Sequence, residues 1–300
     1  MRQIVRTFTV ALIGVVLGSI LLGVLATENA LHVRERPIPE TADARALAGQ
    51  NGSTWEAVQV TAAEGAVLHA WLFTPPDYAG SAVLLLHGVG DTRAGMLDHA
   101  EYLLRSGFSV LLPDSRGHGE SGGAITTYGI EEAADVARWS DWLFQTRHAE
   151  RLYGLGVSLG AGILLQSLAR EPRFRAVVAE SPFSTFPDVA YDRLSLESGI
   201  PRRAFWLVIQ SGFLYARLRY GVDLRRASAL DAVRATHTPI LLIHGTADVN
   251  IPIGHSRALH AINPVATRLW EVPGAKHVHV MSTQPENYAR TVVEWFRSHP

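Results

Sequence analysis

Residues 152–170 read LYGLGVSLGAGILLQSLAR, and this stretch decides the fold. It opens with a short apolar run, turns at GVSLG (156–160) and continues with helical spacing. A strand, a sharp turn and a helix in that order leave the serine exposed at the tip of the turn. Gly156 and Gly160 suit the turn because flanking side chains would collide with the neighbouring strand and helix. Ser158 is therefore the candidate nucleophile.

Apolar runs recur on both sides of this stretch. The segment from Trp55 to Pro75 alternates around Glu64-Gly65 and predicts a β-hairpin. Short apolar runs typical of buried parallel strands follow; they are Val83–Leu86, Val110–Leu112, Leu152–Leu155, Ala176–Ala179, Ile240–Ile243 and Leu269–Val272. Segments of helical length and spacing lie between or after them, at Ala94–Ser106, Ile130–Thr146, Gly160–Arg170, His255–Ile262 and Pro285–Arg297. This alternation predicts a doubly wound α/β fold, with a mostly parallel sheet and helices on both faces.

Two polar side chains follow successive strands downstream of Ser158. Asp248 comes shortly after one buried run, and His277 ends the loop after the next. Parallel strands bring such loops to one edge of the sheet, so we expect both residues near Ser158. The order serine, acid, histidine predicts a triad in which His277 is the general base and Asp248 orients it. His279 is the rival base, because residues two apart on an extended segment share a face.

An oxyanion hole needs backbone N–H groups aimed at the charge that develops on the substrate oxygen. The residue after the nucleophile, Leu159, is expected to supply one. The loop His87-Gly88-Val89-Gly90 follows the first parallel strand, and Val89 is expected to supply the other. Glycines on either side of Val89 let that backbone approach a substrate closely. His87 is expected to form hydrogen bonds inside its own loop.

Residues from Pro182 to Thr238 contain no clear buried strand. They carry many aromatic and aliphatic residues interleaved with arginines. We interpret about 184–232 as a helical cap over the carboxyl edge of the sheet. Trp206 and Phe213 are expected to contact the acyl part of a substrate, because acyl pockets are mostly apolar. The arginines are either the solvated face of the cap helices or face anionic lipid.

The N-terminus has the composition of a membrane segment. Phe8 to Ala26 carries no charge, and about 20 apolar residues cross a bilayer core. Arg2 and Arg6 precede it, which predicts a single-pass anchor with the catalytic domain on the outer side, periplasmic or extracellular. Arg34 and Arg36 follow the segment and weigh against that orientation. A signal peptide cleaved near Ala26, giving a secreted or periplasmic protein, is the alternative.

Three regions are therefore expected along the chain. Residues 1–27 form the anchor or signal peptide, and residues 28–53 form a polar linker carrying Pro37 and Pro39. Residues 54–300 form the α/β domain with its cap. A chain of 300 residues is long enough for one such domain and a substantial buried core.

Composition excludes several other classes. The net charge is −1, so the chain has no electrostatic footprint for nucleic acid. It has no cysteine, which excludes disulfides, thiolate nucleophiles and cysteine-bound zinc. Neither an HExxH nor an HxxEH pattern is present, and the glycines around 154–160 miss the GxGxxG spacing. No metal or cofactor is expected, and the oligomeric state stays open.

Several motifs together resemble the α/β-hydrolase superfamily, over about residues 55–297. They are HGVGDTR (87–93), PDSRGHGESGG (113–123), GVSLG (156–160), ESPF (180–183), HGTADVNIP (244–252) and GAKH (274–277). The most similar branch is that of serine-aminopeptidase-like and small-capped esterase members. The resemblance implies the same triad. It also implies that Asp114, Arg116, His118 and Gly119 are structural residues that hold the loop after their strand.

The expected activity is hydrolysis of carboxylic esters through an acyl-enzyme. The substrate would be a small-molecule or lipid-like acyl compound. Two alternatives stay open: an amide or peptide hydrolase of aminopeptidase type, and a catalytically silent, membrane-attached binding module of the same fold. The sequence motifs are specific for the fold and the triad and leave the substrate undetermined.

Overall fold

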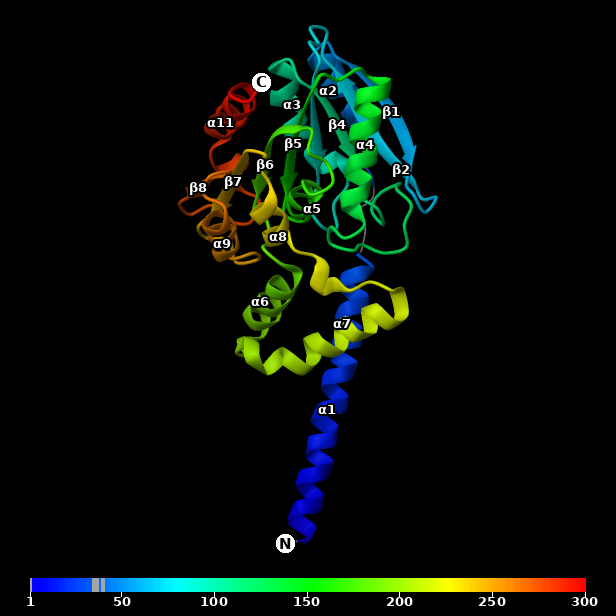
Figure 1. The fold of residues 1–300 in the computed structure, drawn as a ribbon, viewed down its shortest axis with the longest axis vertical. Helices are drawn as coiled ribbons and strands as arrows, with labels where there is room; N and C mark the ends of the chain where they lie inside the picture. Colours follow the sequence, from blue (N-terminus) through cyan, green and yellow to red (C-terminus); the bar gives the residue numbers. More distant parts are fainter. Residues whose placement is uncertain (1, 34–37, 39–40) are drawn as a thin grey trace.

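A computed structural model describes residues 2–33, 38 and 41–300. Within these residues eight strands form one sheet in the order β1-β2-β4-β3-β5-β6-β7-β8 (Figure 1). The first hairpin joins β4 in antiparallel fashion, and the strands from β4 to β8 are all parallel. The strands are β1 Thr54–Thr61, β2 Val67–Thr74, β3 Ser81–Leu86, β4 Ser109–Pro113, β5 Arg151–Val157, β6 Phe174–Glu180, β7 Ile240–Gly245 and β8 Thr267–Val272.

Helices cover both faces of the sheet (Figure 1). The helices are α1 Arg2–Leu31, α2 Ala42–Gln50, α3 Leu97–Arg105, α4 Glu132–Thr146, α5 Leu159–Ser167, α6 Phe186–Ser198, α7 Trp206–Tyr220, α8 Ala229–Ala235, α9 Gly254–Ile262, α10 Val280–Thr283 and α11 Pro285–Arg297. Successive side chains of a strand point to opposite faces. Along β3, Leu84 packs with α4 and α5, whereas Val83 and Leu85 pack with α3 and α11. The sheet is thus buried on both sides.

The predicted doubly wound α/β fold is confirmed. Each of the six apolar runs lies inside a parallel strand, and the segment from Trp55 to Pro75 contains the β1–β2 hairpin. The run Leu269–Val272 belongs to β8, which lies at the edge of the sheet and is less buried than its neighbours. Its polar interruption at Glu271 suits that position, because an edge strand needs no second covered face.

The structure departs from the predicted linker at residues 28–53. Helix α1 continues to Leu31, and α2 forms at Ala42–Gln50. Helix α2 buries Ala44, Leu47 and Ala48, whose spacing of three and four residues puts them on one helical face. That face packs against the core between the sheet, α3 and α11, so the segment is folded where a polar linker was expected. Arg34, Arg36, Pro37 and Pro39 lie outside the described residues.

The cap lies between β6 and β7. Helices α6 and α7 lie beyond the carboxyl ends of the parallel strands, on the side from which α1 projects (Figure 1). The last turns of α1 pack across α7. Gly23 allows this crossing, because a Cβ there would lie 2.3 Å from the carbonyl oxygen of Val208. On α7, a Cβ at Gly212 would lie 2.4 Å from the hydroxyl oxygen of Thr27. The two backbones therefore meet through glycines on both helices.

Polar contacts fix the end of α1 to the domain. The Glu28 carboxylate accepts hydrogen bonds from the hydroxyls of Tyr215 at 2.6 Å and Tyr220 at 2.7 Å. The Tyr128 hydroxyl donates to the carbonyl of Ala30 at 2.8 Å, and the side chain of Leu31 is buried. The C-terminal turns of α1 are thus part of the folded domain, and only the preceding turns stand free of it.

This crossing can be tested with two glycines on the same helix. Gly23→Leu should lower the free energy of unfolding by about 1–3 kcal/mol, the usual cost of overpacking a tight contact. Gly18→Leu is the matched control, because nothing lies within 4 Å of the added Cβ. Thermal unfolding of the two full-length variants in one detergent measures the difference. Equal melting temperatures for both would show that α1 does not pack on the cap.

Candidate active site

Ser158 occupies a strained turn between β5 and α5. Its φ is +52° and its ψ is −113°, a conformation that L-residues rarely adopt and that costs about 1–3 kcal/mol. Gly160 permits the turn, because a Cβ there would lie 2.2 Å from the carbonyl oxygen of Leu86 in β3. The Ser158 N–H donates to the Glu180 carbonyl at 2.9 Å, which ties the turn to β6.

The structure brings Ser158, His277 and Asp248 together. The Ser158 hydroxyl lies 2.9 Å from Nε2 of His277, and Nδ1 of the same ring lies 2.7 Å from Oδ2 of Asp248. These residues follow β5, β8 and β7, so the carboxyl edge of the parallel strands assembles them. Because a carboxylate only accepts hydrogen bonds, Nδ1 carries the proton and donates to Asp248. Nε2 is then free to accept the proton of the Ser158 hydroxyl.

Asp248 is held as an anion by several donors. Its Oδ1 accepts hydrogen bonds from the backbone N–H groups of Asn250 and Ile251, each at 2.9 Å. Its Oδ2 also lies 3.2 Å from Nε2 of the buried His244. Burial opposes the charged form, but the hydrogen bonds from His244 and His277 outweigh it and hold the pKa of Asp248 well below its usual value. The carboxylate therefore stays charged at neutral pH.

His279 points away from this cluster. Its side chain is exposed, and its Nδ1 lies 2.6 Å from the carbonyl oxygen of His277. Between the two histidines, Val278 has a φ of +47°, which a β-branched residue rarely adopts. This turn breaks the extended geometry that would have put both rings on one face. Of the two histidines, it is His277 whose ring lies between Ser158 and Asp248.

The loop after β3 lies beside the serine. A Cβ on Gly88 would lie 3.6 Å from the Cβ of Ser158. His87 is buried and holds this loop, because its Nε2 accepts the Ser115 N–H at 3.0 Å while Nδ1 donates to the Gly88 carbonyl at 2.8 Å. Burial, with a smaller contribution from His118, lowers the pKa of His87 to about 3, which keeps the ring neutral.

The two residues expected to donate to the oxyanion are Leu159 and Val89. Leu159 is the first residue of α5, where a backbone N–H has no partner within its own helix. Val89 lies in the loop that Gly88 holds against the serine, and its side chain is exposed. Among the described residues, neither backbone N–H donates to an acceptor of the chain. Both are therefore available to a ligand.

The loop after β4 has the structural character that the family resemblance implied. Asp114 accepts hydrogen bonds from the N–H of Arg93 at 2.7 Å and that of Glu120 at 2.9 Å. Arg116 pairs with Asp135 through two bonds of 2.7 Å. The ring of His118 accepts the Gly90 N–H at 3.3 Å, linking this loop to the one that contains Val89.

The two expected substrate residues of the cap differ in their surroundings. Phe213 is buried, and its ring centre lies 6.2 Å from that of Phe186 in the contact between α6 and α7. Trp206, at the start of α7, is 60% exposed. Phe213 thus packs in the interior of the cap, whereas Trp206 lies on its surface. This arrangement does not indicate an acyl pocket that both side chains line.

Sequence reasoning missed the residues that hold the site from behind. The Glu180 carboxylate, at the end of β6, accepts hydrogen bonds from the Tyr288 hydroxyl at 2.8 Å and the Val280 N–H at 3.2 Å. It therefore fixes the loop that carries His277. Burial raises the pKa of Glu180 in spite of these donors. The sequence signal for Glu180 is its position at the end of a predicted strand. A single acidic residue at a strand end has several structural explanations, so this signal does not identify a site.

Another buried histidine, His255, joins the cap to the α/β domain. Nδ1 of His255 in α9 lies 2.8 Å from the Ser184 hydroxyl and accepts the Ser184 N–H at 3.1 Å. Its Nε2 donates to Asp192 of α6 at 3.1 Å. Arg202 pairs with the same aspartate at 3.2 Å. No sequence pattern marks this link, because its members come from separate segments.

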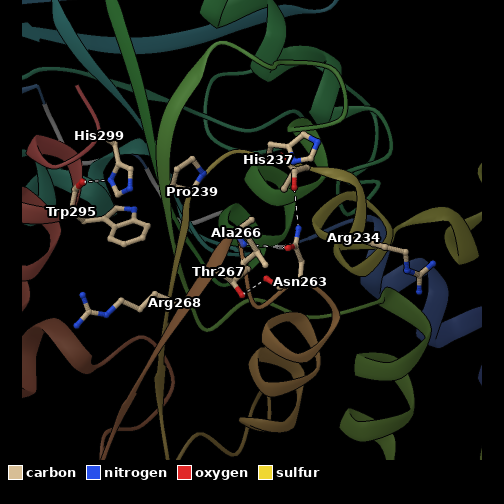
Figure 2. Close-up of a pocket in the computed structure, with 11 residues that line it drawn as sticks. Arg234, His237, Pro239, Asn263, Ala266, Thr267, Arg268, Trp295 and His299 are labelled. Atoms are coloured by element: carbon tan, nitrogen blue, oxygen red, sulfur yellow. Dashed lines mark hydrogen bonds between the residues drawn. The ribbon is translucent and has the colours of Figure 1, made fainter.

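A cavity of about 510 Å³ lies elsewhere in the domain. Figure 2 shows it between the residue before β7, the start of β8 and the end of α11, with Pro239, Thr267 and Trp295 on its wall. These residues mark the opposite ends of the strands from Asp248 and His277. The cavity is therefore separate from the serine cluster.

Buried His99 gives the fold a defined acid sensitivity. Burial lowers the pKa of His99 to about 4, against about 6.5 when unfolded. Between these values the unfolded chain binds a proton that the folded chain does not. The free energy of unfolding therefore decreases by about 1.4 kcal/mol for each unit by which the pH is lowered, for this group alone. His99→Leu should reduce that slope because it removes the titrating ring; the hydrogen bond lost is that of Nε2 with the Tyr288 hydroxyl at 3.4 Å. Denaturant unfolding at several values between pH 4 and 6.5 measures it; an unchanged slope would contradict the assignment.

Comparisons with known proteins agree with this architecture. The sequence model of the family described as serine aminopeptidase, S33 matches residues 78–205. The uncharacterized protein YqkD of Bacillus subtilis is 26% identical over 223 residues, covering 73% of this chain and 72% of that protein. The uncharacterized protein YfhR of Escherichia coli (strain K12) is 26% identical over 237 residues, covering 76% and 75%.

Solved structures share the fold. The esterase Pf2001 of Pyrococcus furiosus superposes with a TM-score of 0.71 at 23% identity, covering 89% of this chain and 99% of that one. With the sheet order and the turn at Ser158, these likenesses define a hydrolase fold of the α/β class. The chain therefore has the α/β-hydrolase fold, the fold that its motifs indicated.

Proposed function

We propose that this protein is a serine hydrolase that cleaves carboxylic esters through an acyl-enzyme. The observation that carries the proposal is the hydrogen-bonded chain from Ser158 through His277 to Asp248, with distances of 2.9 and 2.7 Å. Such a chain activates a hydroxyl that is otherwise a weak nucleophile. Its three members come from separate loops, so their convergence on one edge of the sheet supports a catalytic purpose.

The proposed mechanism is acyl transfer in two halves. Nε2 of His277 takes the proton of Ser158 as the hydroxyl attacks the carbonyl carbon. Asp248 fixes the ring with Nδ1 protonated and stabilises the imidazolium that forms. The ring then gives its proton to the leaving group, and an acyl-enzyme remains. Water attacks this ester with the same histidine as base, and Ser158 recovers its proton.

The backbone N–H groups of Leu159 and Val89 would hold the oxyanion of each tetrahedral intermediate. Leu159 stands at the N-terminus of α5, where the helix dipole favours negative charge. Val89 adjoins Gly88, where an added Cβ would lie 3.6 Å from the Cβ of Ser158. Donors that are already in place cost no reorganisation when the charge develops, which is why they lower the barrier.

An ester substrate is preferred over two alternatives. The structural likeness to an esterase and the small cap favour esters, while the serine aminopeptidase family model keeps amide or peptide substrates as the second candidate. A silent membrane-attached binding module would not need an imidazole Nε2 placed 2.9 Å from a serine hydroxyl. Reaction with a fluorophosphonate probe separates an active serine from a silent one.

We also propose that α1 anchors the protein in a membrane, with the catalytic domain on the outer side. The helix has a mean hydropathy of 2.6 over its most apolar window, and that window is almost wholly exposed. Arg2 and Arg6 precede the uncharged part, as the positive-inside rule requires for this orientation. The helix end is built into the cap, which argues for an uncleaved anchor over a signal peptide cut near Ala26.

Removing the nucleophile is the central test. Ser158→Ala should abolish fluorophosphonate labelling and lower kcat on nitrophenyl esters by about 10⁴ to 10⁶. His277→Ala should match that loss, whereas His279→Ala, the control, should change the rate little because its ring does not contact the serine. Parallel assays on aminoacyl amides should give the lower rates. An unchanged ester rate in Ser158→Ala would refute the proposal.

The identity of the acid is tested by two isosteric changes. Asp248→Asn should lower kcat by about 10⁴, because it disturbs the tautomer of the histidine more than the volume of the site. Glu180→Gln keeps its shape, makes no hydrogen bond to His277, and should cost far less activity. Rates on one nitrophenyl ester, with circular dichroism to verify folding, decide between them. The reverse order of effects would move the acid to β6.

A further inference from the structure

Helix α7 is apolar on both of its sides. One side packs into the domain through Val208, Ile209, Phe213 and Ala216. The opposite side carries Leu214 and Leu218, which are 53% and 77% exposed, with the exposed Trp206 at the first turn. A surface helix usually buries its apolar residues on one face and exposes polar residues on the other, so exposed leucines opposite the buried face indicate a further contact. Leu214 and Leu218 thus keep more than half of their surface exposed on the side away from the buried residues.

The free length of α1 locates a bilayer against this face. Residues 2–22 stand clear of the domain, and the buried contacts of α1 begin at Gly23, where it crosses α7. The uncharged stretch Phe8–Ala26 spans about 28 Å at 1.5 Å per residue, close to the thickness of a bilayer core, and its last four residues lie where α1 crosses α7. Figure 1 shows the free part of α1 projecting beyond α7 on the side away from the sheet. If α1 crosses a membrane, α7 therefore lies at its surface.

The charges around this face suit anionic lipid. Residues 199–226 contain six arginines and one acid, Asp223. All six are exposed; Arg202 pairs with Asp188 and Asp192 of α6, and the other five are Arg203, Arg217, Arg219, Arg225 and Arg226. Clusters of basic residues beside a membrane helix bind anionic headgroups. Trp206 adds a residue type that is enriched at the membrane interface.

From this juxtaposition we propose that the outer face of α7, defined by Trp206, Leu214 and Leu218, docks on an anionic phospholipid bilayer. This docking proposal rests on the proposed anchoring of α1 in the same bilayer. Docking buries the exposed leucines in the interface and places the arginines among the headgroups. Because α6 and α7 lie at the carboxyl edge of the sheet, the edge that carries Ser158 then faces the lipid.

The absence of cysteine permits a direct test on the full-length chain. Leu218→Cys, with Leu214→Cys as a second position, carries a nitroxide spin label in vesicles of mixed phosphatidylcholine and phosphatidylglycerol. Leu12→Cys reports on the α1 span. Val265→Cys, 97% exposed in the loop between α9 and β8, is the aqueous control. Collision with oxygen, relative to a water-soluble nickel chelate, measures contact with lipid, and fluorophosphonate labelling verifies folding.

We expect the oxygen-to-nickel ratio at Leu214 and Leu218 to exceed that at Val265 several-fold, and to fall when phosphatidylglycerol is left out. Aqueous values at both leucines, with a lipid value at Leu12, would overturn docking and leave the anchor standing. An aqueous value at Leu12 would overturn both. Spin–spin broadening at Leu218 that disappears on dilution with unlabelled protein would make a second copy the occupant, and would also overturn the proposal. A ratio unaffected by phosphatidylglycerol would refute the role of anionic lipid.

Discussion

Ser158 can stand at the tip of its turn only because β5, α5 and the loop after β3 approach one another with no side chain between them. Gly160 sits directly against the carbonyl of Leu86, and Gly88 sits against Ser158 itself. The unfavourable backbone angles of the serine persist because these contacts leave it no alternative. The same approach brings the loop that contains Val89 next to the hydroxyl. One tight contact thus positions both the candidate nucleophile and a candidate donor for the oxyanion.

Buried histidines connect the loops around this turn. A neutral imidazole offers one donor and one acceptor, so each ring can join two segments. His87 joins the loops after β3 and β4, and His118 joins the same pair from the other side. His244 joins Asp248 to Ser256 of α9, and His255 joins α9 to the cap. His277 likewise joins two segments, because its Nδ1 contacts Asp248 and its Nε2 contacts Ser158.

The sequence was sufficient where local pattern decides structure. Apolar runs of strand length predicted the parallel strands, and polar residues just after them predicted the edge where Ser158, Asp248 and His277 meet. The choice of His277 over His279 rested on loop position; the positive φ of Val278, which separates them, has no sequence signature. Contacts between distant segments were missed. Neither Asp192 beside His255 nor Glu28 beside Tyr215 belongs to a periodic pattern, and α2 was hidden by a polar composition with only three buried residues.

The contact between α1 and α7 also has a consequence for the order of folding. Glu28 and Tyr215 are 187 positions apart, so their hydrogen bond closes a loop that spans most of the chain. Closing so long a loop costs conformational entropy. The contacts that offset this cost can form only after the neighbouring elements have folded. Strands β1 to β6 all precede α7 in synthesis and depend on contacts among themselves. Although α1 precedes every strand of the sheet along the chain, it is therefore among the last of these elements to reach its partner.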